Sequence, residues 1–268
     1  MGAPSVVMAL MLGTATGAAP IPSGTVKPFL LLATRADDDV ADQEYESFAR
    51  FGGLEPGQLR RIRLEAGPMP AIDLDGYSGI VVGGSPFNAS DPAHQKAALQ
   101  RRVEREMHEL LDDVVARDFP FFGACYGVGT LGAHQGAVID RTYGEPVGPV
   151  PISLTEAGRA DPLLEGLPDV FDAFVGHKEA CRTLPAHATL LASSPLCPVQ
   201  LFRIKSNLYA TQFHPELDEA ATVRRIETYR HAGYFAPEEM DEVIDRVRAA
   251  SVTEPPRILQ NFVRRYAR

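Results

Sequence analysis

The 268-residue chain has no excess of basic residues and only three cysteines. Lys and Arg number 26 against 35 Asp and Glu, giving a formal net charge of −9 at pH 7. This balance disfavours binding to phosphate backbones or anionic lipid, so we expect neither a nucleic acid nor a membrane as partner. Cys125, Cys181 and Cys197 form no CxxC pair. A disulfide framework and a zinc knuckle are therefore not predicted, and a reducing, cytoplasmic location fits best.

Several motifs that bind cofactors or metals are also missing. No GxxxxGK[ST] phosphate loop exists, since none of the four lysines follows a glycine, and there is no HExxH. Gly127, Gly129 and Gly132 spell the GxGxxG of dinucleotide sites, but the first lies four residues beyond the strand end expected at Gly123. No acidic residue ends a strand about 20 positions later, as that motif requires. We expect no cofactor and no metal.

The N-terminal segment lacks the features of a targeting sequence. An apolar run from Val6 to Leu12 resembles part of a secretion signal, but no Lys or Arg precedes Lys27. The run is also shorter than the roughly 20 apolar residues of a membrane span. We expect residues 1–25 to be a disordered extension, residues 26–236 to form the main domain, and residues 237–268 to be a helical extension packed on it.

The pattern of apolar residues after Lys27 alternates between strands and helices. It predicts a doubly wound α/β domain, with a largely parallel, partly mixed sheet and helices on both faces. In such folds the reactive groups collect at the carboxyl ends of the strands. Strands are expected at 29–33, 59–64, 79–82, 120–122, 150–154, 171–174, 190–192, 199–204 and 208–212, and helices at 38–51, 94–118, 128–135, 219–233, 237–250 and 255–266.

The sequence Gly123-x-Cys125-x-Gly127 places a thiol where a strand is expected to turn sharply into a helix. The flanking glycines permit the close backbone approach that a nucleophile elbow requires. The positive end of the helix dipole favours thiolate over thiol. Cys125 is therefore the candidate nucleophile.

His214 and Glu216 end another expected strand and would supply the base. Residues i and i+2 of an extended chain share a face, so Glu216 can bond one ring nitrogen of His214 and leave the other free to take the thiol proton. The loop after the strand at 79–82 contains Gly84, whose N–H is not obstructed by a side chain. With the N–H of Tyr126, it would form an oxyanion hole.

Three segments carry a family resemblance: VVGGSP, GACYGVG and YATQFHPELD, in that order. Between Phe29 and Asp218 the chain resembles a class I glutamine amidotransferase. The stretch LASSPLCPVQLFR is similar to stand-alone members of the type of GMP synthase amidotransferases. The resemblance implies a flavodoxin-like fold and hydrolysis of glutamine to glutamate and ammonia through a γ-glutamyl thioester, with Cys125, His214 and Glu216 at the family's catalytic positions. It also implies that the partner is a synthetase subunit that accepts the ammonia.

One position departs from the family pattern. The family elbow commonly reads GxCxGxQ, and its glutamine helps to hold the amino-acid end of the substrate. Here that position is Gly129, and His177 in the turn Gly176-His177-Lys178-Glu179 is the candidate replacement. Glutamine stays the favoured substrate, while two other functions stay open. If glutamine is not the substrate, the protein would be a hydrolase of another small amide, or a non-catalytic amidotransferase-like binding protein.

Overall fold

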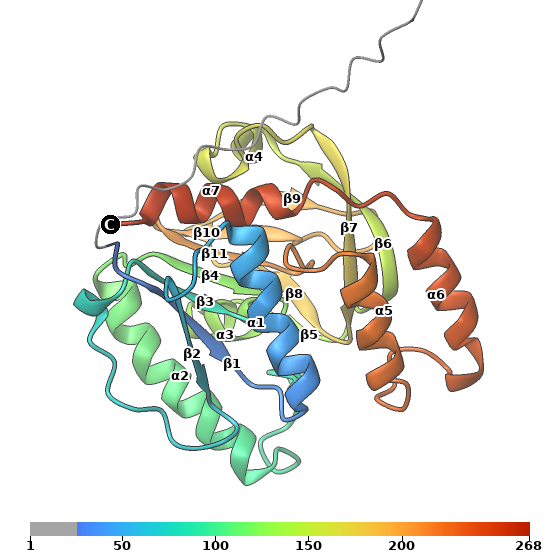
Figure 1. The fold of residues 1–268 in the computed structure, drawn as a ribbon, viewed down its shortest axis with the longest axis horizontal. Coiled ribbons are helices and arrows are strands. Elements are labelled where there is room, and N and C mark those ends of the chain that lie inside the picture. Colours follow the sequence, from blue (N-terminus) through green and yellow to red (C-terminus); the bar gives the residue numbers. More distant parts are fainter. Residues whose placement is uncertain (1–25) are drawn as a thin grey trace, which may run out of the picture.

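The computed structural model describes residues 26–268, so the expected extension at 1–25 lies outside the described residues. A nine-stranded mixed sheet forms the centre, in the order β2-β1-β3-β4-β11-β10-β9-β6-β7 (Figure 1). Neighbours from β2 to β11 are parallel, and those from β11 to β7 are antiparallel. The strands are β1 (Phe29–Ala33), β2 (Leu59–Arg63), β3 (Gly79–Val82), β4 (Phe121–Ala124), β6 (Glu145–Leu154), β7 (Val170–His177), β9 (Ala188–Ser193), β10 (Leu201–Ile204) and β11 (Leu208–Thr211).

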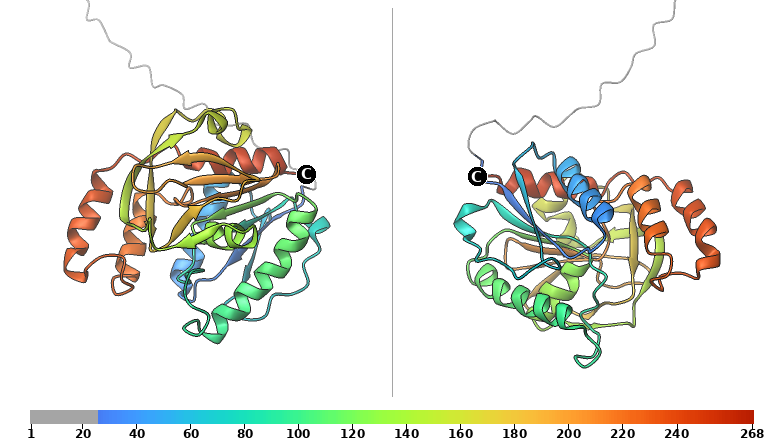
Figure 2. Two further views of the ribbon diagram at one scale, coloured as in Figure 1. Left: turned by 180° about the vertical axis from the view of Figure 1, so that it is seen from behind. Right: turned by 60° about the horizontal axis from the view of Figure 1, so that its bottom comes forward.

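Helices cover both faces of the sheet, which confirms the predicted α/β fold (Figure 2). The buried strand β1 shows the arrangement, because Phe29 and Leu31 pack in the core under α1 and α7, whereas Leu30 and Leu32 pack in the core under α2 and α3. A third apolar cluster joins α5 and α6 to β7. The helices are α1 (Asp38–Gly52), α2 (Ala98–Ala116), α3 (Tyr126–His134), α4 (Glu156–Arg159), α5 (Glu219–Thr228), α6 (Met240–Ala249) and α7 (Pro256–Tyr266), with 3₁₀ turns at Leu74–Gly76, Pro162–Leu164 and Pro237–Glu239.

Four predicted helices have wrong boundaries, and the one expected at 237–250 begins only at Met240, after a 3₁₀ turn. The helix expected at 94–118 begins only at Ala98, because Lys96 donates to the Ala89 carbonyl and to Glu104, holding the preceding residues in a turn. The helix expected at 128–135 begins at Tyr126, immediately after the elbow. The helix expected at 219–233 ends at Thr228, and the chain then runs irregularly to the 3₁₀ turn at Pro237.

The β-rich part contains more strand than the sequence predicts. The strand expected at 150–154 begins at Glu145, because β6 pairs with β7 over almost its whole length. Two unpredicted strands, β5 (Val138–Asp140) and β8 (Ala180–Thr183), form a separate antiparallel pair. Neither VID nor ACRT is a compact apolar run, so the pattern of apolar residues did not reveal these strands.

Candidate active site

The candidate site lies where three neighbouring parallel strands end. Gly84 follows β3, Cys125 follows β4 and His214 follows β11. In the sheet β4 lies between the other two strands, with Phe121 in register with both Ile80 and Leu208. The carboxyl ends of parallel strands meet at one edge, so residues separated by 130 positions in the sequence line one cleft.

Cys125 occupies a sharp turn between β4 and α3. Its backbone has φ 54° and ψ −79°, a left-handed conformation that is strained for a residue with a side chain. Its N–H donates to the Thr211 carbonyl at 2.7 Å, which ties the turn to β11. A Cβ on Gly123 would lie 2.5 Å from the Cα of Gly127, so α3 packs this closely on β4 only because position 123 is glycine. The predicted elbow geometry is present.

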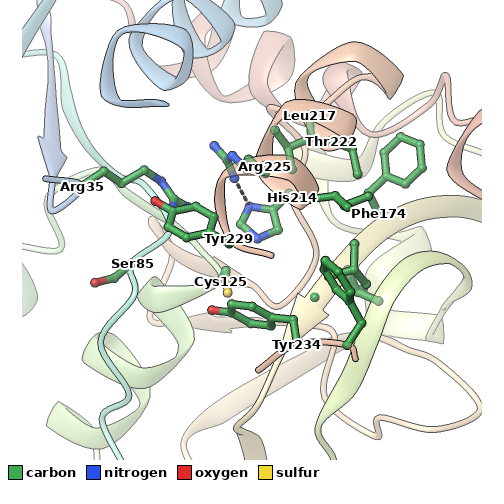
Figure 3. Close-up of a pocket in the computed structure, with 15 residues that line it drawn as sticks. Arg35, Ser85, Cys125, Phe174, His214, Leu217, Thr222, Arg225, Tyr229 and Tyr234 are labelled. Atoms are coloured by element: carbon green, nitrogen blue, oxygen red, sulfur yellow. Dashed lines mark hydrogen bonds between the residues drawn. The ribbon is translucent and has the colours of Figure 1, made fainter. Parts of the chain in front are cut away.

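His214 and Glu216 form a buried pair beside Cys125. The Nδ1 of His214 and the Oε1 of Glu216 are 2.7 Å apart, and Glu216 is fully buried. The Nε2 of His214 has no hydrogen-bond partner within residues 26–268. Cys125 and His214 line the same cavity (Figure 3). One ring nitrogen is therefore held by the carboxylate while the other is free.

A chain of buried charges supports this pair. Both Arg35 Nε and Arg225 donate to Glu44 Oε1, at 2.9 and 3.3 Å, and Arg225 also donates to Glu216 Oε1 at 3.2 Å. The alternation of cations and anions keeps each charge paired in the interior. None of these three residues was predicted from the sequence. Arg35 lies just beyond the end of β1, where the strand-end rule could have found it, but Glu44 and Arg225 lie inside α1 and α5 and carry no local signal.

Burial controls the protonation of the cysteine and the histidine. It raises the pKa of the Cys125 thiol to about 12, against the lowering effect of Arg35. Burial also lowers the pKa of His214, which Glu216 opposes. It would raise the pKa of Glu216 as well, but His214 and Arg225 lower that pKa to about 2. The resting site thus holds a thiol and a neutral imidazole beside a carboxylate. Burial of Cys125 thus acts against the thiolate that the helix terminus favours.

Two hollows meet at Cys125, and both are also lined by Ser85 and Tyr234. The larger, of about 540 Å³, has a mostly apolar wall and contains His214. The smaller, of about 340 Å³, is lined by Tyr126, by Gln212 and by Gly129, which stands where the family commonly has a glutamine. The Nε2 of Gln212 lies 3.8 Å from the Cys125 sulfur. The apolar wall is formed by Val147, Phe174, Val175, Leu217, Ile226 and Phe235.

The two expected oxyanion donors lie beside the cysteine and the histidine. Within residues 26–268 neither the Gly84 N–H nor the Tyr126 N–H donates to a protein acceptor. Gly84 also has a steric role, because a Cβ there would lie 2.9 Å from His214 Cε1 and 2.6 Å from an Arg35 nitrogen. The His214 ring therefore packs directly on a bare backbone.

Gly129 and His177 both line the smaller hollow, and neighbouring groups pack closely on each. A Cβ on Gly129 would lie 2.9 Å from Ala89 Cβ and 3.1 Å from Glu179 Oε1, so no glutamine-like side chain fits there without movement of the loop. His177 is 4% exposed, and its two ring nitrogens lie 2.9 Å from the Glu179 carbonyl and from Glu145 Oε2. His177 lines the smaller hollow, but its polar atoms hold the turn in place.

The segment 229–236, which follows α5, covers the site. Tyr229 accepts a hydrogen bond from Arg35 at 2.9 Å, and Tyr234 lines both hollows (Figure 3). Lys178 holds the segment down, because its ammonium donates to the Ala232 carbonyl and lies 4.6 Å from the centre of the Tyr234 ring. No sequence pattern identified this cover, which was expected to be part of a helix.

The comparison with known protein families agrees with this site. A family model described as glutamine amidotransferase class-I matches residues 60–226, more than half of the chain. The chain therefore belongs to the class-I glutamine amidotransferase family.

Individual relatives include GMP synthases and another glutamine amidotransferase. It is 29% identical over 173 residues to a GMP synthase (glutamine-hydrolyzing) subunit of Thermoplasma volcanium, covering 63% of this chain and 79% of the relative. It is 30% identical over 148 residues to the GMP synthase of Streptomyces avermitilis, covering 54% of this chain but only 26% of that longer protein. The fold resembles a glutamine amidotransferase from Thermotoga maritima, with a TM-score of 0.67, 20% identity, and coverage of 90% of this chain and 98% of that chain.

Proposed function

We propose that the protein is a cysteine-dependent amidase that hydrolyses glutamine, or a related γ-glutamyl amide, to the acid and ammonia. The observation that carries the proposal is the strained Cys125 elbow next to the 2.7 Å His214–Glu216 pair, on adjoining strand ends. A nucleophile, a base and a group that orients the base are what acyl transfer through a thioester requires.

The reaction proceeds in two halves. As the Cys125 sulfur attacks the amide carbon, its proton passes to the free nitrogen of His214, and the N–H groups of Gly84 and Tyr126 bind the developing oxyanion. His214 then returns the proton to the amide nitrogen, the C–N bond breaks, and ammonia leaves a thioester behind. His214 next takes a proton from water, whose oxygen attacks the thioester, and the released sulfur regains that proton. Glu216 stabilises the imidazolium that forms in each half.

A second candidate function is the hydrolysis of a different small amide. It is favoured by the lack of space at Gly129 and by the apolar wall of the larger hollow, which would suit a substrate with an apolar portion. A third is binding without turnover, for which the argument is the departure from the family pattern at Gly129.

The partner is proposed from the relatives. The relative named as a glutamine-hydrolyzing GMP synthase subunit supports a separate synthetase subunit that accepts the ammonia. We keep a cytoplasmic location as part of the proposal, and among residues 26–268 no helix is both long and apolar enough to cross a bilayer. We also propose that residues 237–268 are an extension packed on the domain of residues 26–236, because the apolar side of α7 shares the core with β1.

The experiment that tests the proposal measures ammonia and the product acid after incubation with glutamine, asparagine and γ-glutamyl alkylamides. Cys125→Ala should abolish release, whereas Cys181→Ala, a buried cysteine outside both hollows, should not. Preference for an amide other than glutamine would establish the second function. Absence of any release, together with no labelling of Cys125 by a glutamine-like chloroketone, would establish the third.

A further inference from the structure

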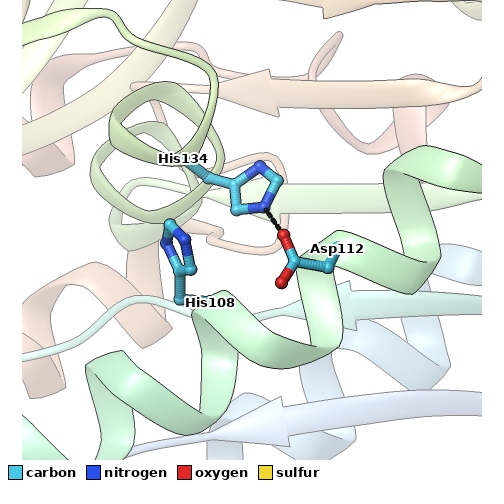
Figure 4. Close-up of side chains that lie close together, drawn as sticks. All are labelled: His108, Asp112 and His134. Atoms are coloured by element: carbon cyan, nitrogen blue, oxygen red, sulfur yellow. Dashed lines mark hydrogen bonds and ion pairs between the residues drawn. The ribbon is translucent and has the colours of Figure 1, made fainter.

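Two histidines and an aspartate come together where α2 meets α3. His108 and Asp112 are four residues apart and share one face of α2, and His134 is the last residue of α3 (Figure 4). One ligand atom from each residue lies within 4.8 Å of the others. His134 Nε2 is 3.0 Å from an Asp112 oxygen, and the centres of the two imidazole rings are 4.6 Å apart. None of the three lines the hollows at Cys125.

We propose that His108, Asp112 and His134 bind one divalent transition-metal ion of the Zn²⁺ type. Imidazole nitrogens and a carboxylate oxygen are ligands that Zn²⁺ takes at about 2.0–2.2 Å, and three protein ligands leave a fourth position for water. Ligand atoms around such an ion lie roughly 3.3–3.5 Å apart. Small side-chain rotations reach this separation, since His108 and Asp112 are exposed and nothing buried needs to move.

The surroundings of His134 suit metal binding. Its Nδ1 lies 2.7 Å from the Gln135 amide, whose other end lies 3.0 Å from His187 Nε2. A histidine bound to metal through Nε2 carries its proton on Nδ1 and needs an acceptor there. A flip of the Gln135 amide supplies that acceptor, and His187 then accepts from the amide nitrogen in its other tautomer. The outer partner of His134 thus serves both the metal-free and the metal-bound state.

The ion would join the C-terminal end of α3 to α2. The other end of α3 begins at the Cys125 elbow, so both ends of this nine-residue helix would be fixed. A second group of possible ligands, Glu145, His177 and Cys197, is buried. We propose no metal there, because both ring nitrogens of His177 already have protein partners. Metal-binding motifs that can be recognised in a sequence lie within one short segment. A site divided between two helices therefore does not appear as such a motif.

The test titrates the full chain, first freed of metal with a chelator, with Zn²⁺ by calorimetry and with Co²⁺ by absorption spectroscopy. The expected result is one saturable site, with a Co²⁺ spectrum lacking the near-ultraviolet band of thiolate coordination. His108→Ala and Asp112→Asn should each weaken binding by more than about 10-fold, the lower end of the loss that removal of an outer-shell partner causes. Asp112→Asn keeps the shape of the side chain and an oxygen that can accept the hydrogen bond from His134, but it removes the negative charge.

His94→Ala is the matched control, because His94 is also an exposed histidine but lies outside the group. Zn²⁺ should raise the melting temperature of the parent and of His94→Ala, and much less that of the other two variants. The proposal is overturned by a lack of saturable binding, by unchanged affinity in both ligand variants, or by a thiolate band that disappears when Cys125 is alkylated. These readouts do not depend on amidase activity, so this proposal and the proposed function can fail separately.

Discussion

The protein contains two groups of one cysteine, one histidine and one glutamate. In the first, Cys125 is partly exposed, and His214 keeps one ring nitrogen free toward a cavity. In the second, Cys197 is fully buried, and Glu145 is bonded by His177, Ser194 and Gln200. Burial raises the pKa of each thiol to about 12. Thiol acidity therefore does not distinguish the groups.

What distinguishes the two groups is the set of hydrogen bonds left unmade. In the second group both ring nitrogens of the histidine already lie against protein oxygens, so neither is open to a reacting molecule. In the first group a ring nitrogen of His214 and the backbone N–H groups of Gly84 and Tyr126 have no protein partner within residues 26–268, and His214 lines a cavity. A reacting molecule needs hydrogen-bonding groups that are free to contact it. In a structural cluster the protein itself occupies these groups.

The largest effect should come from replacing the two cysteines in turn. Cys125→Ala removes the nucleophile, and the loss of amidase activity should be on the order of 10⁶-fold, as for the loss of a nucleophile in a comparable triad. Cys197→Ala should leave the rate per folded molecule unchanged, while removing a buried side chain lowers the melting temperature. Steady-state rates with circular dichroism test both outcomes, and equal losses of activity would remove the distinction between the groups.

The two glutamates should differ almost as strongly. Glu216→Gln keeps the side-chain shape but no longer stabilises the charged form of His214, and kcat should fall by about 10⁴-fold. Glu145→Gln should act mainly on stability, because its partners hold loops and not a reacting group. Kinetics and denaturant unfolding of both variants decide the matter. A variant Glu216→Gln with the parent rate contradicts the role assigned to Glu216.

Gly84→Ala should produce an intermediate loss. The added methyl group would displace the His214 ring or the Gly84 N–H, and disturbing an oxyanion donor costs about 10²–10³-fold in kcat. Gly148→Ala is the matched control, since a Cβ at that position meets no atom within 4 Å. A rate for Gly84→Ala equal to that of the control would argue against the contact with His214.

Replacing Arg225 should move the pH profile. The base must be neutral to act, and burial lowers the pKa of His214, so the acid limb of kcat/KM should lie below pH 6.5. Arg225 also lowers this pKa, so Arg225→Met should shift the limb to higher pH. Arg264→Met, an exposed arginine on α7, should leave it in place. A profile that does not move would mean that Arg225 is only structural.

The smallest effect should appear in acid stability. The pKa of Glu216 is lowered from 4.5 to about 2 in the folded protein, so the unfolded chain binds its proton first as the pH falls. The stabilisation, on the order of 3 kcal/mol, is complete above pH 4.5 and is lost as the pH falls toward 2. Urea unfolding between about pH 6 and 3 should show a shallower decline for Glu216→Gln. Parallel declines would contradict the lowered pKa.

The parts of the site that the sequence predicts are local along the chain. A glycine-flanked cysteine at a strand end and a histidine two residues from a glutamate are readable because a few consecutive residues set the geometry. The strand-end rule then brings both to one edge of the sheet. For the same reason the order of strands and helices up to β4 was predicted well.

The parts that escaped prediction depend on packing between distant segments. Glu44 and Arg225 meet only because α1 and α5 lie side by side at the end of the sheet. The lack of space at Gly129 depends on Ala89 and Glu179, which lie 40 and 50 residues away in the sequence. The protonation of Cys125 depends on how deeply it is buried, and periodicity does not report that.

The segment 229–236 lies beyond residue 226, where the family match ends. The strand ends that carry Cys125 and His214 thus lie inside or next to the matched region, while the segment that covers them lies beyond it. Selection acting on a few residues of this cover, such as Tyr234, can change which molecules enter without altering the turn that holds Cys125. The turn that carries the candidate nucleophile and the segment that covers it are separate parts of the chain, so the wall of the hollows can be changed while the turn stays as it is.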